Sequence, residues 1–201
     1  MNMKNRITTY HYGFFIFSKS LFEAFLKEKK IRNKDLLSYF DKEKELFNEL
    51  CLERNIVIPM IRISNYNYHI FVNEESNLGS NWEEVYYYKN FKINVGDDGL
   101  WIAAFSFFEN WNKNKDKFNT KQSFIGQTVL SGIDSEPIFD NLALHYEVEK
   151  GLKYICIKGL RNSKADSKRL QDAVAFQFEI GDKKENVISD DILSVSFNLD
   201  G

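Results

Sequence analysis

The chain offers few side chains whose types and spacing could support chemistry. His145 and Glu147 are two residues apart in an alternating run, so both would project from one face of a strand. A carboxylate beside an imidazole can orient it as a general base, but no candidate nucleophile accompanies this pair. We therefore interpret it as a solvated strand face, and we predict no catalytic residues.

Metal and phosphate sites also lack sequence support. Asp97-Asp98 and Asp190-Asp191 could offer oxygen ligands to a divalent cation, but adjacent acids next to glycine or before a strand are typical turn residues. The GxSxG, HExxH, GxxxxGK[ST], GxGxxG and EF-hand patterns are absent from the sequence. Cys51 and Cys156 lie far apart and outside any CxxC, which predicts two unpaired thiols. We predict neither a metal site nor a cofactor.

Composition limits the class of protein. The 201 residues are 43% hydrophobic and 15% aromatic, enough for a core, and the net charge is −2. This charge balance lacks the basic excess typical of nucleic-acid binding. No run reaches the roughly 18 apolar residues of a membrane helix, and the apolar run 12–17 is too short for most signal peptides. We expect a cytoplasmic protein without nucleic-acid or membrane partners.

The stretch from Trp82 to Trp111 contains all three tryptophans, and we expect the fold to be organised around it. Two strand-like runs, Glu84 to Val95 and Leu100 to Phe108, flank an Asp/Gly turn at 96–99, which predicts a β-hairpin. The second run is apolar on both alternating faces. It should therefore be a central strand that is covered on both sides.

The N-terminal part predicts a strand followed by helices. Ser20 and Glu23 have capping-box spacing, which would begin a helix at Leu21. Asn33 would cap a second amphipathic helix, and its apolar pattern suggests a break near Asp41.

Most other runs alternate between apolar and polar residues, as half-buried antiparallel strands do. Ser64-Asn65 predicts a β-hairpin between the runs on either side of it, and Lys150-Gly151 predicts a turn between two further runs. Pro59 predicts an edge position or a break for its strand. The predicted strands are 10–17, 56–63, 66–72, 142–148, 152–159, 174–180 and 193–199.

Together these elements predict an α+β fold, with antiparallel sheets forming a sandwich-like β core and N-terminal helices packed on one side. We expect one domain over 1–201. The polar stretch 112–123 is the best candidate for a boundary between an α+β part, 1–111, and a mostly β part, 124–201.

An acidic and aromatic segment is the strongest candidate for a binding surface. Four glutamates gather near one tryptophan with no basic residue among them, and three consecutive tyrosines that follow must place rings on both faces of a strand. Acids beside aromatic anchors are found at protein interfaces, although a solvated acidic loop is the simpler alternative. The predicted partner-binding residues are Glu74, Glu75, Trp82, Glu83, Glu84, Tyr86 and Tyr87, joined by Asp97 and Asp98 at the neighbouring turn.

In its overall character the chain resembles the immunity proteins that protect bacteria from their own polymorphic or contact-dependent growth inhibition toxins. The shared character is a cytoplasmic, aromatic-rich, slightly acidic α+β protein without catalytic motifs, and no residue role can be carried over. The resemblance implies direct binding to a cognate toxin. Many such toxins are nucleases with basic active sites, which acids would complement. Two alternatives stay open: a non-catalytic small-ligand or carbohydrate-binding β-sandwich, and an enzyme with an unrecognised site.

Overall fold

The computed structural model describes residues 5–9, 11–73, 81–120, 122–129, 138–164, 173–184 and 189–199. The strands form two five-stranded sheets, sheet A in the order β1-β4-β10-β9-β5 and sheet B in the order β3-β2-β6-β8-β7. All neighbours are antiparallel except β4 and β10. The strands are β1 (Arg6–Thr8), β2 (Gly13–Phe17), β3 (Val57–Ile61), β4 (Asn67–Val72), β5 (Trp82–Val95), β6 (Leu100–Ala104), β7 (Phe124–Val129), β8 (Ile138–Tyr146), β9 (Gly151–Asn162) and β10 (Val174–Gly181).

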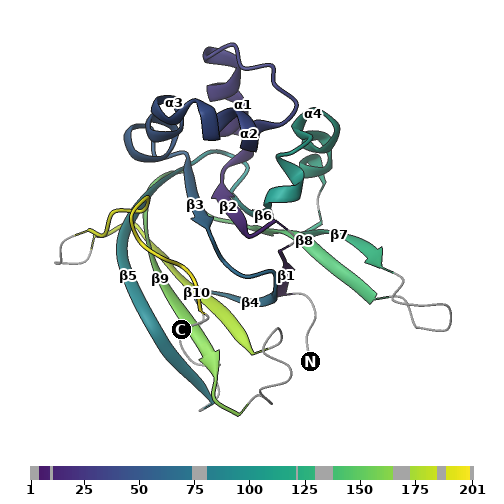
Figure 1. The fold of residues 1–201 in the computed structure, drawn as a ribbon. Coiled ribbons are helices and arrows are strands. Elements are labelled where there is room, and N and C mark those ends of the chain that lie inside the picture. Colours follow the sequence, from purple (N-terminus) through teal and green to yellow (C-terminus); the bar gives the residue numbers. More distant parts are fainter. Residues whose placement is uncertain are drawn as a thin grey trace.

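The helices and the two sheets form three layers. One face of sheet B packs against the helices in a core that includes Phe22, Phe40 and Trp101, and its other face packs against sheet A. Figure 1 shows the helices grouped above sheet B, with sheet A curving away below it. The predicted α+β sandwich with helices on one side is confirmed. The helices are α1 (Lys19–Glu28), α2 (Leu36–Lys42), α3 (Lys44–Asn48) with a π-helical turn at Glu49–Glu53, and α4 (Trp111–Asn114).

Strand β6 is the predicted central strand, third of five in sheet B and buried along its whole length. Its end was predicted wrongly, because the strand stops at Ala104 and a 3-10 turn follows at Phe105–Phe107. The rings of Phe105 and Phe108 both lie 4.7 Å from the ring of Phe15. Residues of odd and even number point to opposite faces of a strand, so the backbone must turn to bring both rings to one side.

The predicted β-hairpin between β5 and β6 is wrong, because β5 pairs with β9 in sheet A and β6 pairs with β2 and β8 in sheet B. A single bridge between Gly96 and Gly99 is all that remains of hairpin pairing. The hairpin predicted at Ser64-Asn65 is also wrong, because β3 and β4 belong to different sheets. This turn and the predicted turn at Lys150-Gly151 both carry the chain from one sheet to the other. The connection from β1 to β2 does the same, so four short corners link the two sheets.

Each corner contains a residue with positive φ. Tyr12 (57°) follows β1, Arg62 (59°) follows β3, Gly99 (68°) precedes β6 and Gly151 (127°) begins β9. A left-handed residue bends the backbone sharply, which suits a chain that must leave the plane of its sheet. A side chain at Gly99 would place its Cβ 2.5 Å from the carbonyl oxygen of Tyr146, so this corner requires glycine.

The prediction that Pro59 lies in an edge strand is confirmed. Pro59 is in β3, at the edge of sheet B, and pairs with Phe15 of β2. The polar stretch 112–123 contains most of α4 and a 3-10 turn at Lys115–Asn119, with Phe118 buried. Both sheets combine strands that precede this stretch with strands that follow it.

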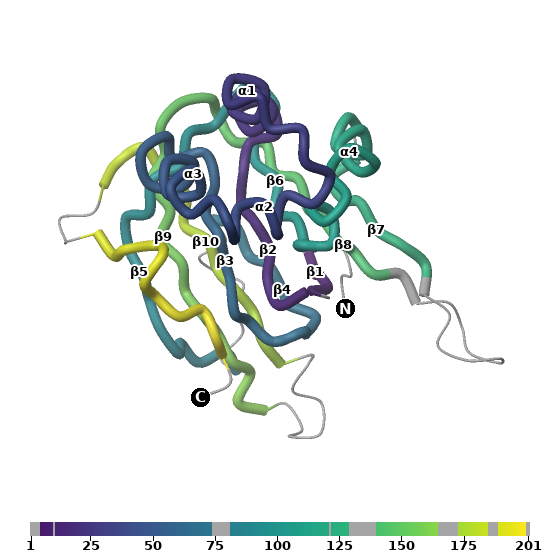
Figure 2. The backbone as a smooth tube through the Cα atoms, turned by 45° about the horizontal axis from the view of Figure 1, so that its top comes forward, coloured from purple at the N-terminus to yellow at the C-terminus, as the bar shows by residue number. Residues whose placement is uncertain are grey.

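The predicted C-terminal strand 193–199 is not a strand. The segment 189–199, here named the C-terminal strap, instead fills the core between the sheets with three buried side chains, Ile192, Phe197 and Leu199. Figure 2 shows the strap, in yellow, crossing β5 and β9. Alternating hydrophobicity was a correct sign of burial, but the strap lies across a sheet face and not along a strand edge.

The second helix has a different cap from the predicted one. The side chain of Asp35 accepts a hydrogen bond from the amide of Ser38 at 3.0 Å, so the N-cap lies two residues beyond Asn33. The predicted break near Asp41 is present, because α2 ends at Lys42 and α3 begins at Lys44.

Cys51 and Cys156 are free, buried thiols, as predicted. Burial raises the pKa of the Cys51 thiol well above its ordinary value, which keeps it protonated. Within the described residues, no helix is long and apolar enough to cross a membrane.

Replacing Trp101 with Ala should remove about 3–5 kcal/mol from the free energy of unfolding, because it leaves a cavity in the core. The Trp101 ring is 2% exposed and packs 5.1 Å from Phe118 and 4.7 Å from the His145 ring. Urea unfolding of the variant gives this value directly. Trp82→Ala, the same change at a partly exposed position, is the control and should cost less. Equal losses in both variants would contradict the special position of β6.

Candidate functional site

The described part of the predicted acidic surface lies at the first residues of β5, the strand at one edge of sheet A. Glu83 and Glu84 are exposed there, and neither forms an ion pair with another described residue. Val85, next to them, is 45% exposed. Glu74 and Glu75 of the same prediction lie outside the described residues.

Trp82 opens β5 and is packed onto a neighbouring part of the sheet. Its ring meets the rings of His69 and Phe71 edge-on, at 5.7 and 6.0 Å between centroids. Both partners belong to β4, so Trp82 holds the beginning of β5 against the sheet. Its partial exposure leaves some of the ring for contact with another molecule.

Tyr86 and Tyr88 face the core side of sheet A, where they hold the C-terminal strap. Their rings stack at 4.7 Å, and their hydroxyls donate to the carbonyl oxygens of Phe197 (2.8 Å) and Ser196 (3.0 Å). Burial, with smaller contributions from neighbouring tyrosines, raises the pKa of Tyr86 far above its ordinary value. The predicted partner residue Tyr86 therefore has a structural role.

Tyr87 lies on the opposite face, so the predicted distribution of tyrosine rings on both faces is confirmed. The ammonium groups of Lys89 and Lys158 lie 4.3 and 4.8 Å from its ring centroid. Its hydroxyl donates to Glu179 at 2.9 Å, and Lys158 pairs with the same carboxylate at 2.7 Å. Glu179 pairs with one of the two lysines, and the cation–π contacts with both lysines hold the ring in place.

Asp97 and Asp98 lie at the other end of β5 from Trp82. The strand has 14 residues, and at about 3.3 Å per residue the path along it from one end to the other is roughly 40 Å. Asp97 is exposed and pairs with Lys150 at 2.9 Å. The structure therefore does not bring the two aspartates together with the acids at the start of β5.

Asp98 is the centre of a hydrogen-bond cluster that joins the β5–β6 corner to helix α1. Its carboxylate accepts from the hydroxyls of Ser18 (2.6 Å) and Ser20 (2.5 Å) and from the Ser20 amide (2.9 Å). The Gly96 amide donates to the Ser18 hydroxyl at 3.1 Å. Burial alone would raise the pKa of Asp98, but these hydrogen bonds outweigh it and hold the pKa below its ordinary value.

This cluster explains why the capping box predicted for α1 is wrong. The helix begins at Lys19, two residues before the predicted Leu21, with Ser18 as its N-cap. Glu23 pairs with Lys19 at 3.1 Å and so does not reach back to cap the helix. The capping carboxylate is Asp98, 78 residues away from Ser20 in sequence.

The free edge of β5 is closed by hydrogen bonds over its second half. At a bulge, Lys89 donates its amide to the Asp190 carboxylate at 2.7 Å and accepts from the Asp190 amide at 3.2 Å. Further along, the Asn94 amide donates to the Asn55 carbonyl at 2.6 Å. The residues Glu83–Tyr86 make no backbone hydrogen bond to any described residue outside the β5–β9 ladder.

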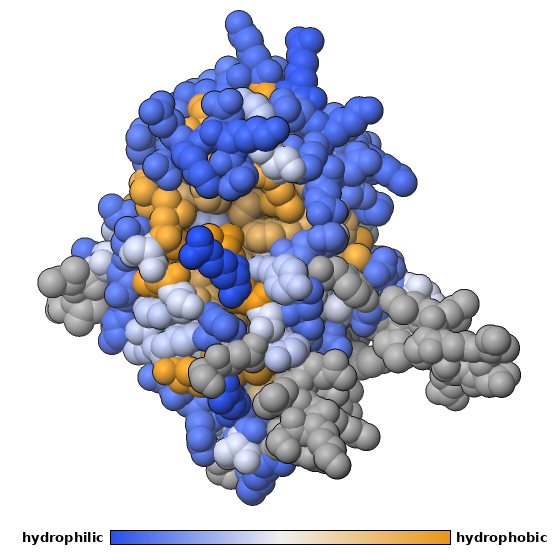
Figure 3. Space-filling view, in the orientation of Figure 1, coloured by the Kyte–Doolittle hydropathy of each residue, from blue (hydrophilic) through white to orange (hydrophobic). Residues whose placement is uncertain are grey.

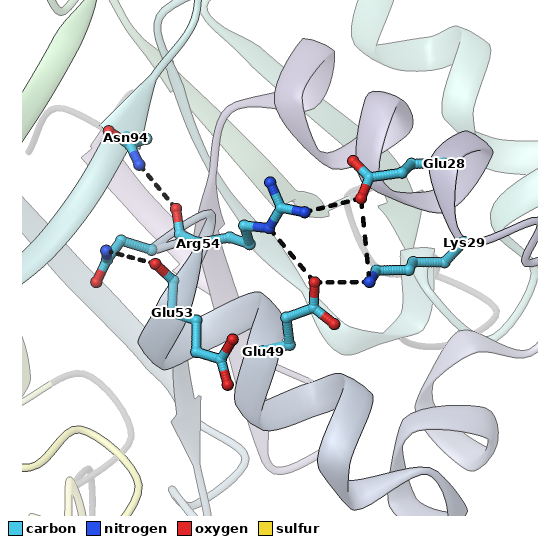
Figure 4. A network of polar contacts seen from close by, with 7 residues as sticks. Glu28, Lys29, Glu49, Glu53, Arg54 and Asn94 are labelled. Atoms are coloured by element: carbon cyan, nitrogen blue, oxygen red, sulfur yellow. Dashed lines mark hydrogen bonds and ion pairs between the residues drawn. The ribbon is translucent and has the colours of Figure 1, made fainter.

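A network of charged groups supports the closed half of this edge (Figure 4). Arg54 contacts Glu28 at 2.7 Å and Glu49 at 3.3 Å, and Lys29 contacts Glu49 at 2.7 Å. The Asn94 side chain donates to the Arg54 carbonyl at 2.7 Å. The hydrogen bond from Lys29, helped by both cationic charges, lowers the pKa of Glu49. The end of α1, the π-helical turn and β5 are thus joined in one contact chain.

His145 and Glu147 do not form the general-base pair that sequence spacing allowed. Strand β8 ends at Tyr146, so Glu147 lies beyond it. A ring nitrogen of His145 lies 2.7 Å from the carbonyl oxygen of Asp98, and the ring packs against Trp101. His145 is therefore part of the β5–β6 corner.

An imidazole–carboxylate pair that the sequence did not indicate is formed by His11 and Glu109, with 3.0 Å between Nδ1 and the carboxylate oxygen. Ser106 and His11 line the same cavity of about 560 Å³. The Ser106 hydroxyl is buried and makes no hydrogen bond to a described residue, so no described base is placed to activate it. Both members of the pair are more than 40% exposed, and the arrangement does not assemble a nucleophile.

The aspartate pairs have structural partners. The Asp190 carboxylate accepts a hydrogen bond from the Lys89 amide. The Asp191 carboxylate accepts one from the Leu193 amide at 3.0 Å, in a turn of the strap. Among the residues that the structure describes, no group of three or more His, Cys, Asp or Glu side chains could hold a metal ion.

Comparisons with known proteins identify no relative. No protein-family model, curated protein or solved structure matches the chain.

Replacing Asp98 with Asn should lower the free energy of unfolding by about 1–2 kcal/mol at neutral pH, because an amide oxygen replaces a carboxylate that accepts three hydrogen bonds. The pKa of Asp98 is lower in the folded state than the ordinary 3.8. Its contribution is therefore complete above about pH 4 and is lost as the pH falls through the folded-state value. Urea unfolding of both proteins across this range should show the difference narrowing in acid.

Asp97→Asn is the matched control for this experiment. Asp97 is the exposed neighbour of Asp98, and its replacement should leave the free energy of unfolding within about 0.5 kcal/mol of the original at every pH. A difference between the Asp98 variant and the original protein that stays constant through the acid range would contradict the assigned role of the carboxylate.

Proposed function

We propose that this protein is an immunity protein, which neutralises a cognate bacterial toxin by binding it through the first residues of β5. The proposed docking surface consists of the exposed residues Glu83, Glu84 and Val85 with the adjoining free backbone edge, and part of the Trp82 ring borders it. Tyr86 and Tyr87 support it from the two faces of the sheet and are not its main contacts.

The observation that carries the proposal is the contrast between the two halves of the β5 edge. Its second half is closed by Asp190 and Asn55, whereas Glu83–Tyr86 has no backbone partner among the described residues outside the ladder. An open strand edge offers a row of amides and carbonyls to an extended segment of another protein. Natural sheets usually protect such an edge, and the described residues protect only its second half.

Charge gives the proposed edge its selectivity. Glu83 and Glu84 have no cationic partner among the described residues, so both carboxylates are available to an incoming basic surface. Unpaired acids accelerate association with a basic partner and disfavour acidic ones. A nuclease toxin with a basic active region has the chemistry that this surface would select.

Protection of cells is the test of the immunity function. The protein is co-expressed with the product of the gene directly upstream of its own, in cells that this product alone arrests. Growth should be restored, and the two purified proteins should form a complex. Continued arrest despite normal expression of both proteins would overturn the proposed function.

The double variant Glu83→Lys, Glu84→Lys tests the proposed surface. Association with the toxin should slow by at least about tenfold at low salt, and the rate should lose most of its dependence on salt. Both side chains are exposed, so the free energy of unfolding should stay within about 0.5 kcal/mol per substitution. Stopped-flow binding and urea unfolding measure the two quantities.

Glu53→Lys, Glu147→Lys is the matched control, because these glutamates are also exposed, form no ion pair with a described residue and give the same change in net charge. It should bind almost as fast as the original protein. Equal slowing in both double variants would mean that net charge, and not the start of β5, governs association.

A further inference from the structure

An apolar groove of about 360 Å³ lies where the corners after β1 and β3 meet helices α2 and α3. Its walls include four phenylalanines, Phe15, Phe40, Phe47 and Phe105. Figure 3 shows hydrophobic surface in a hollow on this side of the molecule, beneath the helices. The volume lies within the range of small-molecule sites, and the lining is of the apolar and aromatic kind that such sites have.

The rim of the groove contains two strained residues. Tyr12 and Arg62 both line it, and both have positive φ without being glycine. Each such residue costs on the order of 1 kcal/mol or more, and strain of this kind concentrates at functional sites. The two corners are held together, because the Ile63 amide donates to the Tyr12 carbonyl at 3.2 Å and the Tyr12 amide donates to Asn65 at 2.9 Å.

The same geometry leaves a large aromatic ring in solvent. Tyr12 is 62% exposed, the highest value among the exposed large hydrophobic residues of the described chain. A ring beside an aromatic-lined groove can close over a bound ring edge-on or in offset stacking.

The charges around the groove favour an anion. Asp41 and Lys44 neutralise each other at 2.7 Å, and His11 is paired with Glu109. Arg62 forms no ion pair with any described residue. A guanidinium in this position can donate two parallel hydrogen bonds to a carboxylate.

We propose that this groove binds a small aromatic carboxylate, with its ring among the phenylalanines and its carboxylate on Arg62. The groove lies at the corners after β1 and β3 and is separate from the docking edge of β5. Small-molecule binding in the groove would therefore be a second activity, beside the proposed protein binding. Either can fail without the other.

Phenylacetate and its neutral isostere phenylacetamide are the probes. Titration followed by protein NMR should show saturable binding of phenylacetate with Kd of about 1 mM or tighter, as expected for a ligand of this size. Phenylacetamide should bind at least about tenfold more weakly. Intermolecular NOEs should join the phenylacetate ring to Phe47 and Tyr12.

Arg62→Gly removes the guanidinium at a position whose φ of 59° suits glycine, so this variant should fold. It should lose the preference for phenylacetate over phenylacetamide, whereas Arg32→Gln, at an exposed arginine outside the groove, should keep it. Thermal unfolding of both variants confirms that they are folded.

Three results would overturn the proposal. They are the absence of saturable phenylacetate binding to the original protein, NOEs to residues outside the groove, and an unchanged preference for phenylacetate in folded Arg62→Gly. Toxin binding measured in the presence of phenylacetate keeps the two proposals distinguishable, because the β5 edge should bind equally well with the groove filled.

Discussion

The rest of the structure depends on one constraint, that the centre of sheet B, at β2 and β6, is apolar on both faces. Every residue of β6 is at most 2% exposed, with Leu100 and Ile102 toward sheet A and Trp101 toward the helices. A sheet of this kind cannot leave either face in water, because each buried large side chain contributes about 1.5–3 kcal/mol. The helices cover one face, and sheet A with the C-terminal strap covers the other.

The packing of sheet A against sheet B explains why the chain needs the four corners. A chain that builds two packed sheets with short connections must leave one sheet and enter the other, and it does so four times at residues with positive φ. Asp98 then locks one corner to the start of α1. The same arrangement leaves β5 as the last strand of sheet A, so its edge must be closed by other means or stay open.

The sequence predicts which residues are buried better than it predicts which strands pair. The two-sided burial of β6 and the α+β class follow from local patterns of apolar residues, and the edge position of Pro59 follows from the amide proton that proline lacks. Whether a turn forms a hairpin or a corner depends on whether its two flanking strands pair with each other or with strands of different sheets. The Asp/Gly composition of the Gly96–Gly99 turn is compatible with either outcome. Long-range partners such as Asp98 for Ser20, or Glu109 for His11, leave no local pattern at all. The exposure of Glu83 and Glu84 was therefore predictable, but their separation from Asp97 and Asp98 was not.

Residue-resolved amide hydrogen exchange of the free protein tests most directly the claim that β6 anchors the fold while the start of β5 is an open edge. Amides of β6 should exchange only through global unfolding, whereas amides of Glu83–Tyr86 that face away from β9 should exchange faster by several orders of magnitude. Amides in the closed half, Lys89 and Asn94, should be protected. Protection of the whole Glu83–Tyr86 segment to the level of β6 would contradict the account, because it would mean that this edge is already paired.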